Sequence, residues 1–266
     1  ILGSANLNNT YGYNNNLLKE KEFKKIINYL RKKNFFLIDT ALNYKNSQKI
    51  IFKYITQKTK LITKLPKYDE TTNIHHWLKK NIEEIFCKLK VKKVYCILLH
   101  HPNDLLGPHG KIIFNEINDL KKKKFIKKIG ISVYDKQIVN KIIKKYKIDI
   151  IQLPFSVFDR RFLKYNWLKK LKKNNKILIH ARSIFFQGFL TDNFNSNLNV
   201  KKKMKSKILQ WNSFCEKKKI KNNIAAINYV NQIKEIDNLI IGVNSFDQFK
   251  ENISDTNLYK NIKFPE

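Results

Sequence analysis

Four residues of this sequence have side chains that can transfer or direct a proton, and their spacing relative to short apolar runs is similar. Asp39 ends the run FFLID, Lys64 ends LITK and His100 ends YCILLH, while Tyr44 follows Asp39 by five positions. Side chains alternate between the two faces of a strand, so each strand-end residue shares a face with the apolar residue two positions earlier. If those apolar residues fill a barrel, the polar groups meet at its mouth, with Tyr44 on the loop above.

Together these side chains suit the protonation of an oxygen anion. A free tyrosine has a pKa of about 10 and is a poor proton donor at neutral pH. A neighbouring ammonium such as Lys64 favours the phenolate and lowers this pKa, and Asp39 can hold the lysine in an ion pair. The His100 imidazole can orient the oxygen that receives the proton. Singly, each residue has an ordinary explanation, such as a helix cap or a packing aromatic, but four at matching strand ends favour catalysis.

Eight apolar runs of strand length alternate along the chain with stretches of helical periodicity. This alternation is typical of a parallel sheet whose strands are joined by crossover helices. The helical stretches repeat their apolar residues every three or four positions, as Phe23, Ile26, Ile27 and Leu30 do. The predicted strands cover residues 1–5, 35–39, 61–64, 95–100, 129–132, 150–153, 177–181 and 239–242.

Eight β/α units predict an α/β fold of the (β/α)8 type, a TIM barrel, formed by residues 1–266 as a single domain. An open doubly wound sheet is the competing fold. Such a sheet would bring a glycine-rich turn after its first strand to hold a dinucleotide, and the sequence has no such turn and only seven glycines. The closed barrel is therefore the favoured fold.

Composition narrows the class of protein and its compartment. The 266 residues contain no apolar stretch near the ~20 residues needed to cross a bilayer, and no export signal opens the sequence, so we expect no membrane association. Cys87, Cys96 and Cys215 are odd in number and widely spaced, which favours reduced thiols and a cytoplasmic location. No pair of cysteines or histidines has zinc-binding spacing, so we expect no metal.

The formal charge of +33 is far above the ~2–8 of ordinary small domains. One interpretation is a protein that binds nucleic acid or another anionic surface. The other is drift in composition, because Lys, Asn and Ile are all abundant and all have A/T-rich codons. The lysines are spread over the chain without a nucleic-acid-binding motif, so drift is favoured and nucleic acid is not an expected partner.

The order of these motifs resembles the aldo-keto reductase family, nearly from end to end. ILGSAN is similar to the family's first barrel strand, IDTALNYKNSQ to its second strand and loop, and ITKLP to its third strand. LLHHP resembles the fourth-strand motif of His, any residue and Pro, which makes His100 the family histidine and His101 its variable neighbour. The segments KKIGISVYD, IIQLPFSVFDRR, ILIHARSIFFQGFL and IIGVNSFDQFKENI are similar to strands five to eight with their loops.

The resemblance implies an oxidoreductase that reduces an aldehyde or ketone to an alcohol by hydride transfer from NAD(P)H. Tyr44 is then the general acid, Lys64 lowers its pKa while held by Asp39, and His100 orients the substrate oxygen. The dinucleotide is expected to lie extended across the barrel mouth, with NADP(H) favoured and NAD(H) as the alternative. The residues that match the family's cofactor contacts are Ser132, Gln152, Arg182, Ser183, Phe185, Gln187, Gly188, Val243, Asn244, Gln248, Glu251 and Asn252.

Two positions near the expected nicotinamide depart from the family pattern. Val133 stands where the family often has an asparagine that contacts the carboxamide, and Arg182 replaces an aromatic residue that often stacks on the ring. A guanidinium plane can stack on a ring, but its charge disfavours the oxidised, cationic nicotinamide. The sequence also starts at the first strand, so we expect the short hairpin that closes the barrel floor in the family to be absent or truncated.

The positions that often bind the 2′-phosphate of NADPH depart as well. They read Gly242, Val243 and Gln248 in this sequence, and Asn244, Ser245 and Lys250 are the residues that could compensate. The preference for NADP(H) therefore rests on the family resemblance more than on these residues.

Two other functions stay open beside carbonyl reduction. A barrel kept as a cofactor-binding regulatory subunit would agree with Val133 and Arg182, although a non-catalytic barrel has little reason to keep a buried lysine beside a tyrosine. A basic nucleic-acid-binding protein would leave the four residues unexplained. HARSIFFQGFL and FSVFDRRFL most resemble bacterial members encoded with surface-polysaccharide or nucleotide-sugar genes, which makes a keto-sugar one candidate substrate.

Overall fold

A computed structural model of the protein describes residues 1–10, 12, 17–34, 37–56, 58–88, 91–174, 176–192, 201–254, 262 and 264. Eight strands in these ranges form one parallel sheet, in which each strand pairs with its neighbours in sequence order. The sheet closes on itself because Leu2 pairs in parallel with Ile241, just after the last strand. The strands are β1 (Leu2–Gly3), β2 (Leu37–Asp39), β3 (Lys60–Leu65), β4 (Val94–Leu99), β5 (Ile126–Ser132), β6 (Ile150–Pro154), β7 (Leu178–Arg182) and β8 (Asn238–Leu239).

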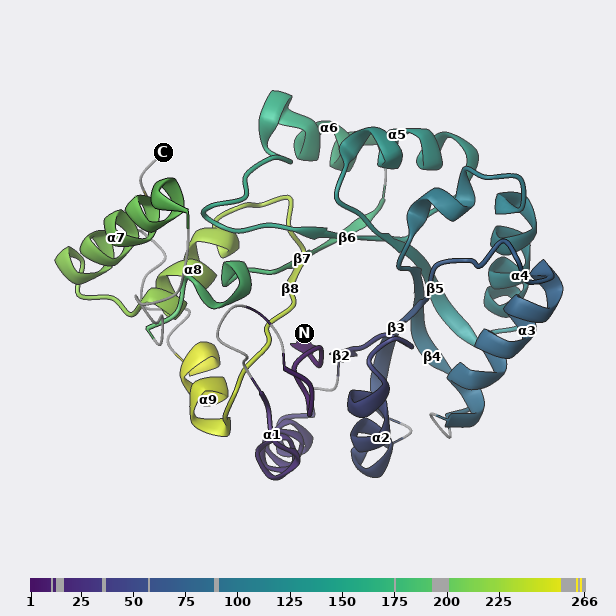
Figure 1. Cartoon of the computed structure of the whole chain (residues 1–266), viewed down its shortest axis with the longest axis horizontal. Coiled ribbons are helices and arrows are strands. Elements are labelled where there is room, and N and C mark those ends of the chain that lie inside the picture. The colour runs from purple at the N-terminus through teal and green to yellow at the C-terminus, as the bar shows by residue number, and fades with distance from the viewer. Residues whose placement is uncertain are drawn as a thin grey trace.

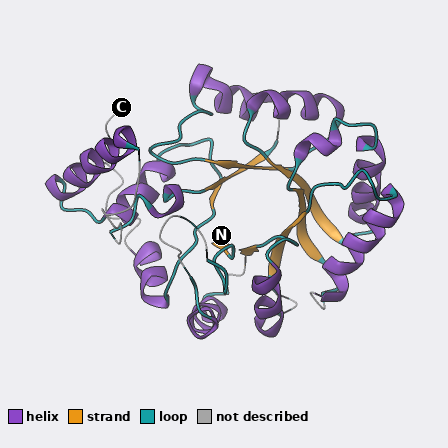
Figure 2. Ribbon diagram, viewed as in Figure 1, coloured by secondary structure: helices purple, strands orange, loops and turns teal. Residues whose placement is uncertain are grey.

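Helices surround this ring of strands, as Figure 1 and Figure 2 show. They are α1 (Glu20–Lys32), α2 (Lys45–Tyr54), α3 (Ile74–Glu83), α4 (Gly110–Lys122), α5 (Lys136–Lys145), α6 (Trp167–Asn174), α7 (Lys202–Lys217), α8 (Asn222–Asn231) and α9 (Phe246–Ser254). A π-helical turn covers Glu84–Lys88, and 3₁₀ turns cover Pro102–Leu105, Lys164–Asn166 and Phe186–Gly188. The predicted (β/α)8 fold is confirmed, with both α7 and α8 between β7 and β8.

Side chains with an oxygen acceptor fix where several helices begin. Asn73 precedes α3, and its Oδ1 accepts a hydrogen bond from the N–H of His75 at 3.0 Å. Asp135 precedes α5 and accepts from the N–H of Gln137 at 2.8 Å. The Ser245 hydroxyl caps α9 in the same way. Each cap satisfies an amide that the first turn of a helix would otherwise leave without a partner.

Apolar residues form one core between the strands and helices and a second, smaller core inside the barrel. Ile62, Cys96, Leu98 and Ile150 form the inner core. Gly130 of β5 faces the same space without a side chain. A Cβ at that position would lie 2.2 Å from Leu98 Cδ2 and 2.6 Å from the Ile150 carbonyl oxygen, so glycine is required for the interior to pack.

The first and last strands are shorter than the sequence predicts. Residues 1–5 and 239–242 were the predicted ranges, whereas β1 and β8 have two residues each. The chain around β1 and the chain after β8 are joined by a few backbone hydrogen bonds, including one of 2.9 Å from the Gly3 N–H to the Ile241 carbonyl. The close approach leaves little space at Gly3, where a Cβ would lie 3.1 Å from Ile240 Cγ2. Residues 35–36, which begin the predicted second strand, lie outside the described residues.

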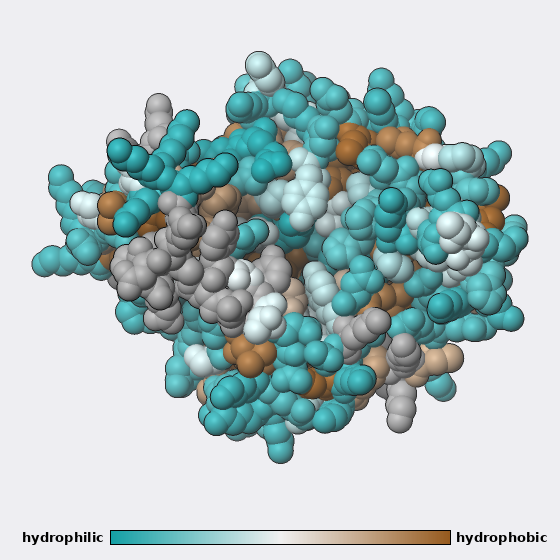
Figure 3. All heavy atoms as spheres, in the orientation of Figure 1, coloured by the Kyte–Doolittle hydropathy of each residue, from teal (hydrophilic) through white to brown (hydrophobic). Residues whose placement is uncertain are grey.

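The surface is mostly polar, and the face seen in Figure 3 shows hydrophobic residues only in separate spots. Within the described ranges, five large hydrophobic side chains are exposed: Phe125, Tyr134, Tyr165, Leu209 and Ile253. None of the helices in those ranges combines the length and apolar character needed to span a membrane. Cys87, Cys96 and Cys215 are free thiols.

Candidate active site

The carboxyl ends of three neighbouring strands bring ionisable residues to the mouth of the barrel. Asp39 ends β2, Lys64 lies in β3 one residue from its end, and His100 directly follows β4. Ile62 and Leu98, two positions before Lys64 and His100, belong to the inner core. The alternation expected from the sequence is therefore present, with apolar residues below and ionisable residues above.

Asp39 and Lys64 form an ion pair that is almost completely buried. Lys64 Nζ donates to Asp39 Oδ1 at 2.5 Å and to the Thr40 carbonyl at 2.9 Å. Asp39 Oδ2 accepts a hydrogen bond from Gln152 Nε2 at 2.8 Å. Burial lowers the pKa of the Lys64 ammonium, although the Asp39 carboxylate opposes this shift. The two partners of Nζ hold the charge of Lys64 at a defined position inside the barrel.

Tyr44 and His100 lie beside this ion pair. Lys64 Nζ is 5.6 Å from the centroid of the Tyr44 ring, and the centroids of Tyr44 and His100 are 6.3 Å apart in an edge-to-face arrangement. Burial, followed by the Lys64 charge, lowers the pKa of His100 to about 4. His100 is therefore neutral at physiological pH and has one N–H donor. Its Nδ1 is buried and has no hydrogen-bond partner among the described residues.

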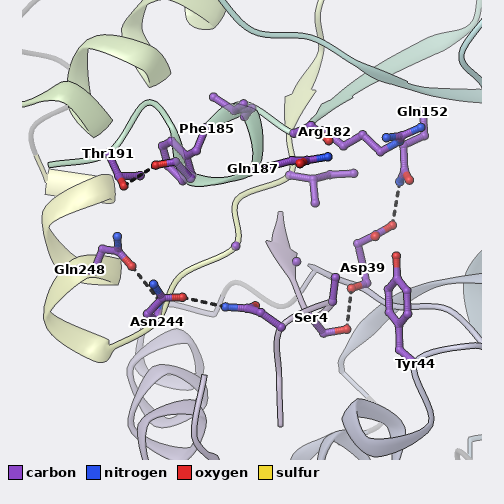
Figure 4. A pocket seen from close by; sticks show the side chains of 18 residues that line it. Ser4, Asp39, Tyr44, Gln152, Arg182, Phe185, Gln187, Thr191, Asn244 and Gln248 are labelled. Atoms are coloured by element: carbon purple, nitrogen blue, oxygen red, sulfur yellow. Dashed lines mark hydrogen bonds between the residues drawn. The ribbon is translucent and has the colours of Figure 1, made fainter. Parts of the chain in front are cut away.

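An elongated cavity opens to solvent beside Asp39 and Tyr44, which line it, whereas Lys64 and His100 are not among its described lining residues. Figure 4 shows Asp39, Tyr44 and Gln152 at one end and Asn244 and Gln248 at the other. Between the two ends, the walls come from the loop after β1, the turn after β7 and the segment from β8 to α9. The described lining residues are Gly3, Ser4, Ala5, Asn6, Asp39, Tyr44, Gln152, Arg182, Ser183, Ile184, Phe185, Gln187, Gly188, Thr191, Ile240, Gly242, Asn244 and Gln248.

Most residues that the sequence assigns to a cofactor line this cavity. They are Gln152, Arg182, Ser183, Phe185, Gln187, Gly188, Asn244 and Gln248. Ser183 and Gln187 have positive φ angles of 59° and 60°, so the chain turns sharply here. The turn is closed by its own hydrogen bonds, because the N–H of Phe186 donates to the Ser183 carbonyl at 2.9 Å and the N–H of Gly188 donates to the Phe185 carbonyl at 3.0 Å.

Four other assigned residues are not among the described residues that line the cavity: Ser132, Val243, Glu251 and Asn252. Ser132 and Val243 are buried. Asn223 Nδ2 donates to Glu251 Oε2 at 3.0 Å and to Asn252 Oδ1 at 2.8 Å. In the structure, Glu251 and Asn252 thus connect α9 to α8.

Arg182 is held in the cavity wall by its neighbours. Its guanidinium carbon lies 4.3 Å from the centroid of the Tyr134 ring, and Nη2 donates to the Val133 carbonyl at 3.5 Å. Burial is the main cause of the lowered pKa values of Lys64 and His100, and the Arg182 charge adds to both shifts. The positive field of Arg182 therefore reaches the ionisable groups at the barrel mouth.

Sequence reasoning missed three polar residues that line the cavity: Ser4, Asn6 and Thr191. The Ser4 hydroxyl donates to the Asp39 carbonyl at 2.9 Å. Asn6 Nδ2 donates to the Val243 carbonyl at 2.9 Å and to Asn244 Oδ1 at 3.0 Å. Ser4 and Asn6 follow β1 as Tyr44 follows β2, so the rule that polar residues gather after barrel strands could have found them.

Two buried oxygens on lining residues lack partners among the described residues: Gln152 Oε1 near Tyr44, and Asn6 Oδ1 near Asn244. Buried polar atoms are nearly always hydrogen-bonded, so each of these oxygens is available to accept from a ligand or a water molecule. Among the described residues, no group of three or more His, Cys, Asp or Glu side chains could hold a metal ion.

Comparisons with known proteins identify the fold and the family. The structure resembles an aldo-keto reductase of Bacillus halodurans in its holo form, with a TM-score of 0.75 and 17% identity over 96% of this chain and 85% of that one. It resembles a glycerol dehydrogenase of Gluconobacter oxydans with a TM-score of 0.70 and 17% identity over 100% and 93% of the two chains. No curated protein matches the sequence significantly. The model of the aldo/keto reductase family matches residues 1–262, and the chain therefore belongs to this family of NAD(P)H-dependent carbonyl reductases.

Proposed function

We propose that Tyr44 is the proton donor of this reductase and that Lys64, Asp39 and His100 support it in reducing an aldehyde or ketone to an alcohol. One observation carries the proposal: a buried ion pair fixes an ammonium beside the Tyr44 ring, with a neutral imidazole next to it. A buried charge is costly unless it is paired, so this arrangement is more than a packing solution. It suits a reaction in which negative charge develops on oxygen.

Each side chain has a distinct part in the proposed reaction. A nicotinamide, when bound beside Tyr44, would supply the hydride. The Tyr44 hydroxyl transfers its proton to the carbonyl oxygen as negative charge develops there, and the Lys64 ammonium stabilises the resulting phenolate. The neutral His100 imidazole donates an N–H hydrogen bond to the same oxygen and orients it. Asp39 holds Lys64 in position.

The cavity has donors and acceptors that suit a nicotinamide dinucleotide. The unpaired oxygen of Gln152 is an acceptor for the amide N–H of the carboxamide, and Ser132 is the other sequence-assigned contact there. We assign the pyrophosphate to the turn from Ser183 to Gly188 and the adenosine to residues 243–252. The expectation of NADP(H) rests on the family resemblance, because the described lining residues at the adenosine end include no lysine or arginine.

The decisive test of the proposed acid is Tyr44→Phe, which removes only a hydroxyl. We expect carbonyl reduction to fall by roughly 10²–10⁴-fold, the usual contribution of a general acid, while cofactor binding measured by fluorescence titration is unchanged. Tyr165→Phe is the matched control, because Tyr165 is exposed on the surface. Unchanged turnover in Tyr44→Phe would remove the proposed acid. A wild-type protein that binds cofactor but turns over no carbonyl would favour a regulatory barrel.

The substrate class and the compartment are finer parts of the proposal. The resemblance to surface-polysaccharide and nucleotide-sugar members makes keto-sugars the first compounds to assay, beside simple aldehydes and ketones. Cofactor oxidation, followed by the loss of dihydronicotinamide absorbance, ranks them by kcat/KM. The free thiols of Cys87, Cys96 and Cys215 support a reducing compartment such as the cytoplasm.

A further inference from the structure

The end of the cavity far from Tyr44 has features that distinguish between the two forms of the nicotinamide cofactor. We propose that this protein selects NAD(H) over NADP(H), with Asn6 accepting a hydroxyl of the adenosine ribose where NADPH carries its 2′-phosphate. The proposal rests on the proposed function, since it takes the nicotinamide to lie at Tyr44. The adenosine then lies among Asn6, Gly242, Asn244 and Gln248.

Charge is the first argument. A 2′-phosphate is a dianion that proteins usually bind through lysine or arginine. Arg182 is the only such residue among the described lining residues, and it lies toward Gln152 and Asp39 (Figure 4). Lys250 of α9, and Lys25 of α1 beside it, are paired with acids: Lys250 with Asp247 at 3.2 Å, and Lys25 with Glu22 at 2.7 Å. These four groups sum to no net charge.

The backbone at the start of α9 gives the second argument. The N-terminus of a helix can bind a phosphate through its amide groups. Here the N–H of Phe246 donates to Glu22 Oε2 at 2.9 Å, and the N–H of Gln248 donates to the Ser245 hydroxyl at 3.1 Å. The N–H of Asn244 donates to the Gln248 side chain at 2.8 Å. A carboxylate of the protein already takes one of these amides, so an added phosphate would have to displace it.

The orientation of Asn6 gives the third and most specific argument. Its Nδ2 donates to the Val243 carbonyl, which can only accept, and this fixes which way the amide points. Asn6 Oδ1 is then a buried acceptor without a described partner. It lies 3.7 Å from where a Cβ of Gly242 would be, at a position that the resemblance assigns to the 2′-phosphate. An acceptor there receives a ribose O–H and repels a phosphate oxygen.

The net charge of the protein acts in the opposite direction and has to be separated from these local contacts. With a formal charge of +33, the exposed lysines attract any anion, and NADPH carries more negative charge than NADH. This long-range attraction is screened at about 0.15 M salt, where the Debye length is about 8 Å. The local contacts are screened much less, so selectivity for NADH should increase as salt is added.

The first experiment measures the affinity of the wild-type protein for both cofactors. NADH and NADPH are titrated by fluorescence at about 0.15 M salt, and ADP-ribose and its 2′-phosphate by calorimetry, which reports on the adenosine end without the nicotinamide. We expect the unphosphorylated member of each pair to bind at least tenfold more tightly, the scale of one charge-assisted hydrogen bond. Equal or tighter binding of the phosphorylated members would overturn the proposal.

The second experiment introduces the missing charge with Gly242→Lys. Gly242 has space for a side chain, since the nearest atom to a Cβ there is Asn6 Oδ1 at 3.7 Å. We expect the ratio of NADPH to NADH dissociation constants to fall roughly tenfold or more. Gly107→Lys is the matched control, because it adds the same charge on an exposed loop where a Cβ meets no atom closer than 3.8 Å. A ratio that falls equally in both variants would show that only net charge matters and would overturn the proposal.

A third variant keeps the proposal testable if Gly242→Lys does not fold. Glu22→Gln removes the carboxylate at the start of α9, and we expect NADPH to bind about two- to fivefold more tightly. Glu20→Gln is its control, because Glu20 instead contacts Lys53 and Tyr54. No tightening in Glu22→Gln would count against the charge argument.

These results separate the selectivity from the proposed function. Tighter binding of NADH together with full turnover in Tyr44→Phe would leave the selectivity intact and remove the proposed acid. Tighter binding of NADPH together with lost turnover in Tyr44→Phe would overturn the selectivity alone.

Discussion

Replacing Asp39 with asparagine should destabilise the protein strongly, because it leaves the Lys64 ammonium without a counter-charge in the barrel. Lys64 is 2% exposed, and its Nζ has only the Asp39 carboxylate and the Thr40 carbonyl as described partners. Removing one member of a buried ion pair typically costs about 3–5 kcal/mol. For 266 residues the entropy of unfolding is about 0.56 kcal/mol/K, so Tm should fall by about 5–9 °C in Asp39→Asn.

The loss should depend on pH in a definite direction. Burial already lowers the pKa of Lys64 from 10.5, and removing Asp39 takes away the interaction that opposes this shift. The unfolded chain then binds a proton that the folded variant does not hold at high pH, so the free energy of unfolding rises with pH. The deficit of Asp39→Asn relative to wild type should therefore shrink as the pH rises towards 10.5, the ordinary pKa of the lysine.

A double variant separates stability from catalysis. Asp39→Asn combined with Lys64→Met removes both charges and should recover most of the lost stability, since a neutral replacement of a buried pair is often tolerated. Turnover should stay low, because no ammonium is left beside Tyr44. Thermal unfolding by circular dichroism and carbonyl reduction are measured on the same samples. A single Asp39→Asn variant within 1 kcal/mol of wild type, or a double variant with full turnover, would refute this reasoning.

Two further predictions concern the barrel interior. Burial lowers the pKa of His180 to about 4, so between about pH 4 and 6.5 the unfolded chain binds a proton that the folded chain lacks. The free energy of unfolding should fall as the pH drops through this window; His180 contributes up to roughly 3 kcal/mol, and His100, whose pKa is also lowered to about 4, adds to the fall. Urea unfolding over that pH range checks this prediction, and His180→Gln should make the free energy of unfolding less dependent on pH. Gly130→Ala should destabilise by about 1–3 kcal/mol because its Cβ overlaps Leu98 and Ile150, whereas Gly107→Ala on an exposed loop should not; equal Tm values for the two alanine variants would contradict the packing argument.

The residues near Tyr44 could be predicted from the sequence because their positions follow from local rules. A strand alternates its faces, and the ends of parallel strands meet at one edge of the sheet. Lys64 lies two positions after Ile62 and His100 two positions after Leu98, so each ionisable residue was expected on the same face as its apolar neighbour. These rules need no knowledge of distant contacts. The structure places all three groups at the barrel mouth with Tyr44 beside them.

The end of the cavity that we propose for the adenosine could not be predicted in the same way, because it depends on contacts between the two ends of the chain. Asn6 and Val243 are 237 positions apart, and their hydrogen bond fixes the orientation of the Asn6 amide. No periodicity in the sequence specifies such a contact. The lengths of β1 and β8 were overestimated for a related reason. The apolar runs near Gly3 and Gly242 look like full strands, although the ladders of β1 with β2 and of β8 with β7 contain only two residue pairs each.

The junction where β1 meets β8 has a consequence for the motions of the barrel. Few backbone hydrogen bonds close the ring there, and they join residues that meet only after almost the whole chain has folded. The amide protons of Gly3 and Ile241 should therefore exchange with solvent sooner than those in the long ladder between β4 and β5. Gly3 and Asn6 line the cavity on one side of this junction, and Gly242 lines it on the other. A ligand that contacts both sides should therefore stabilise the closed barrel and make its opening less frequent.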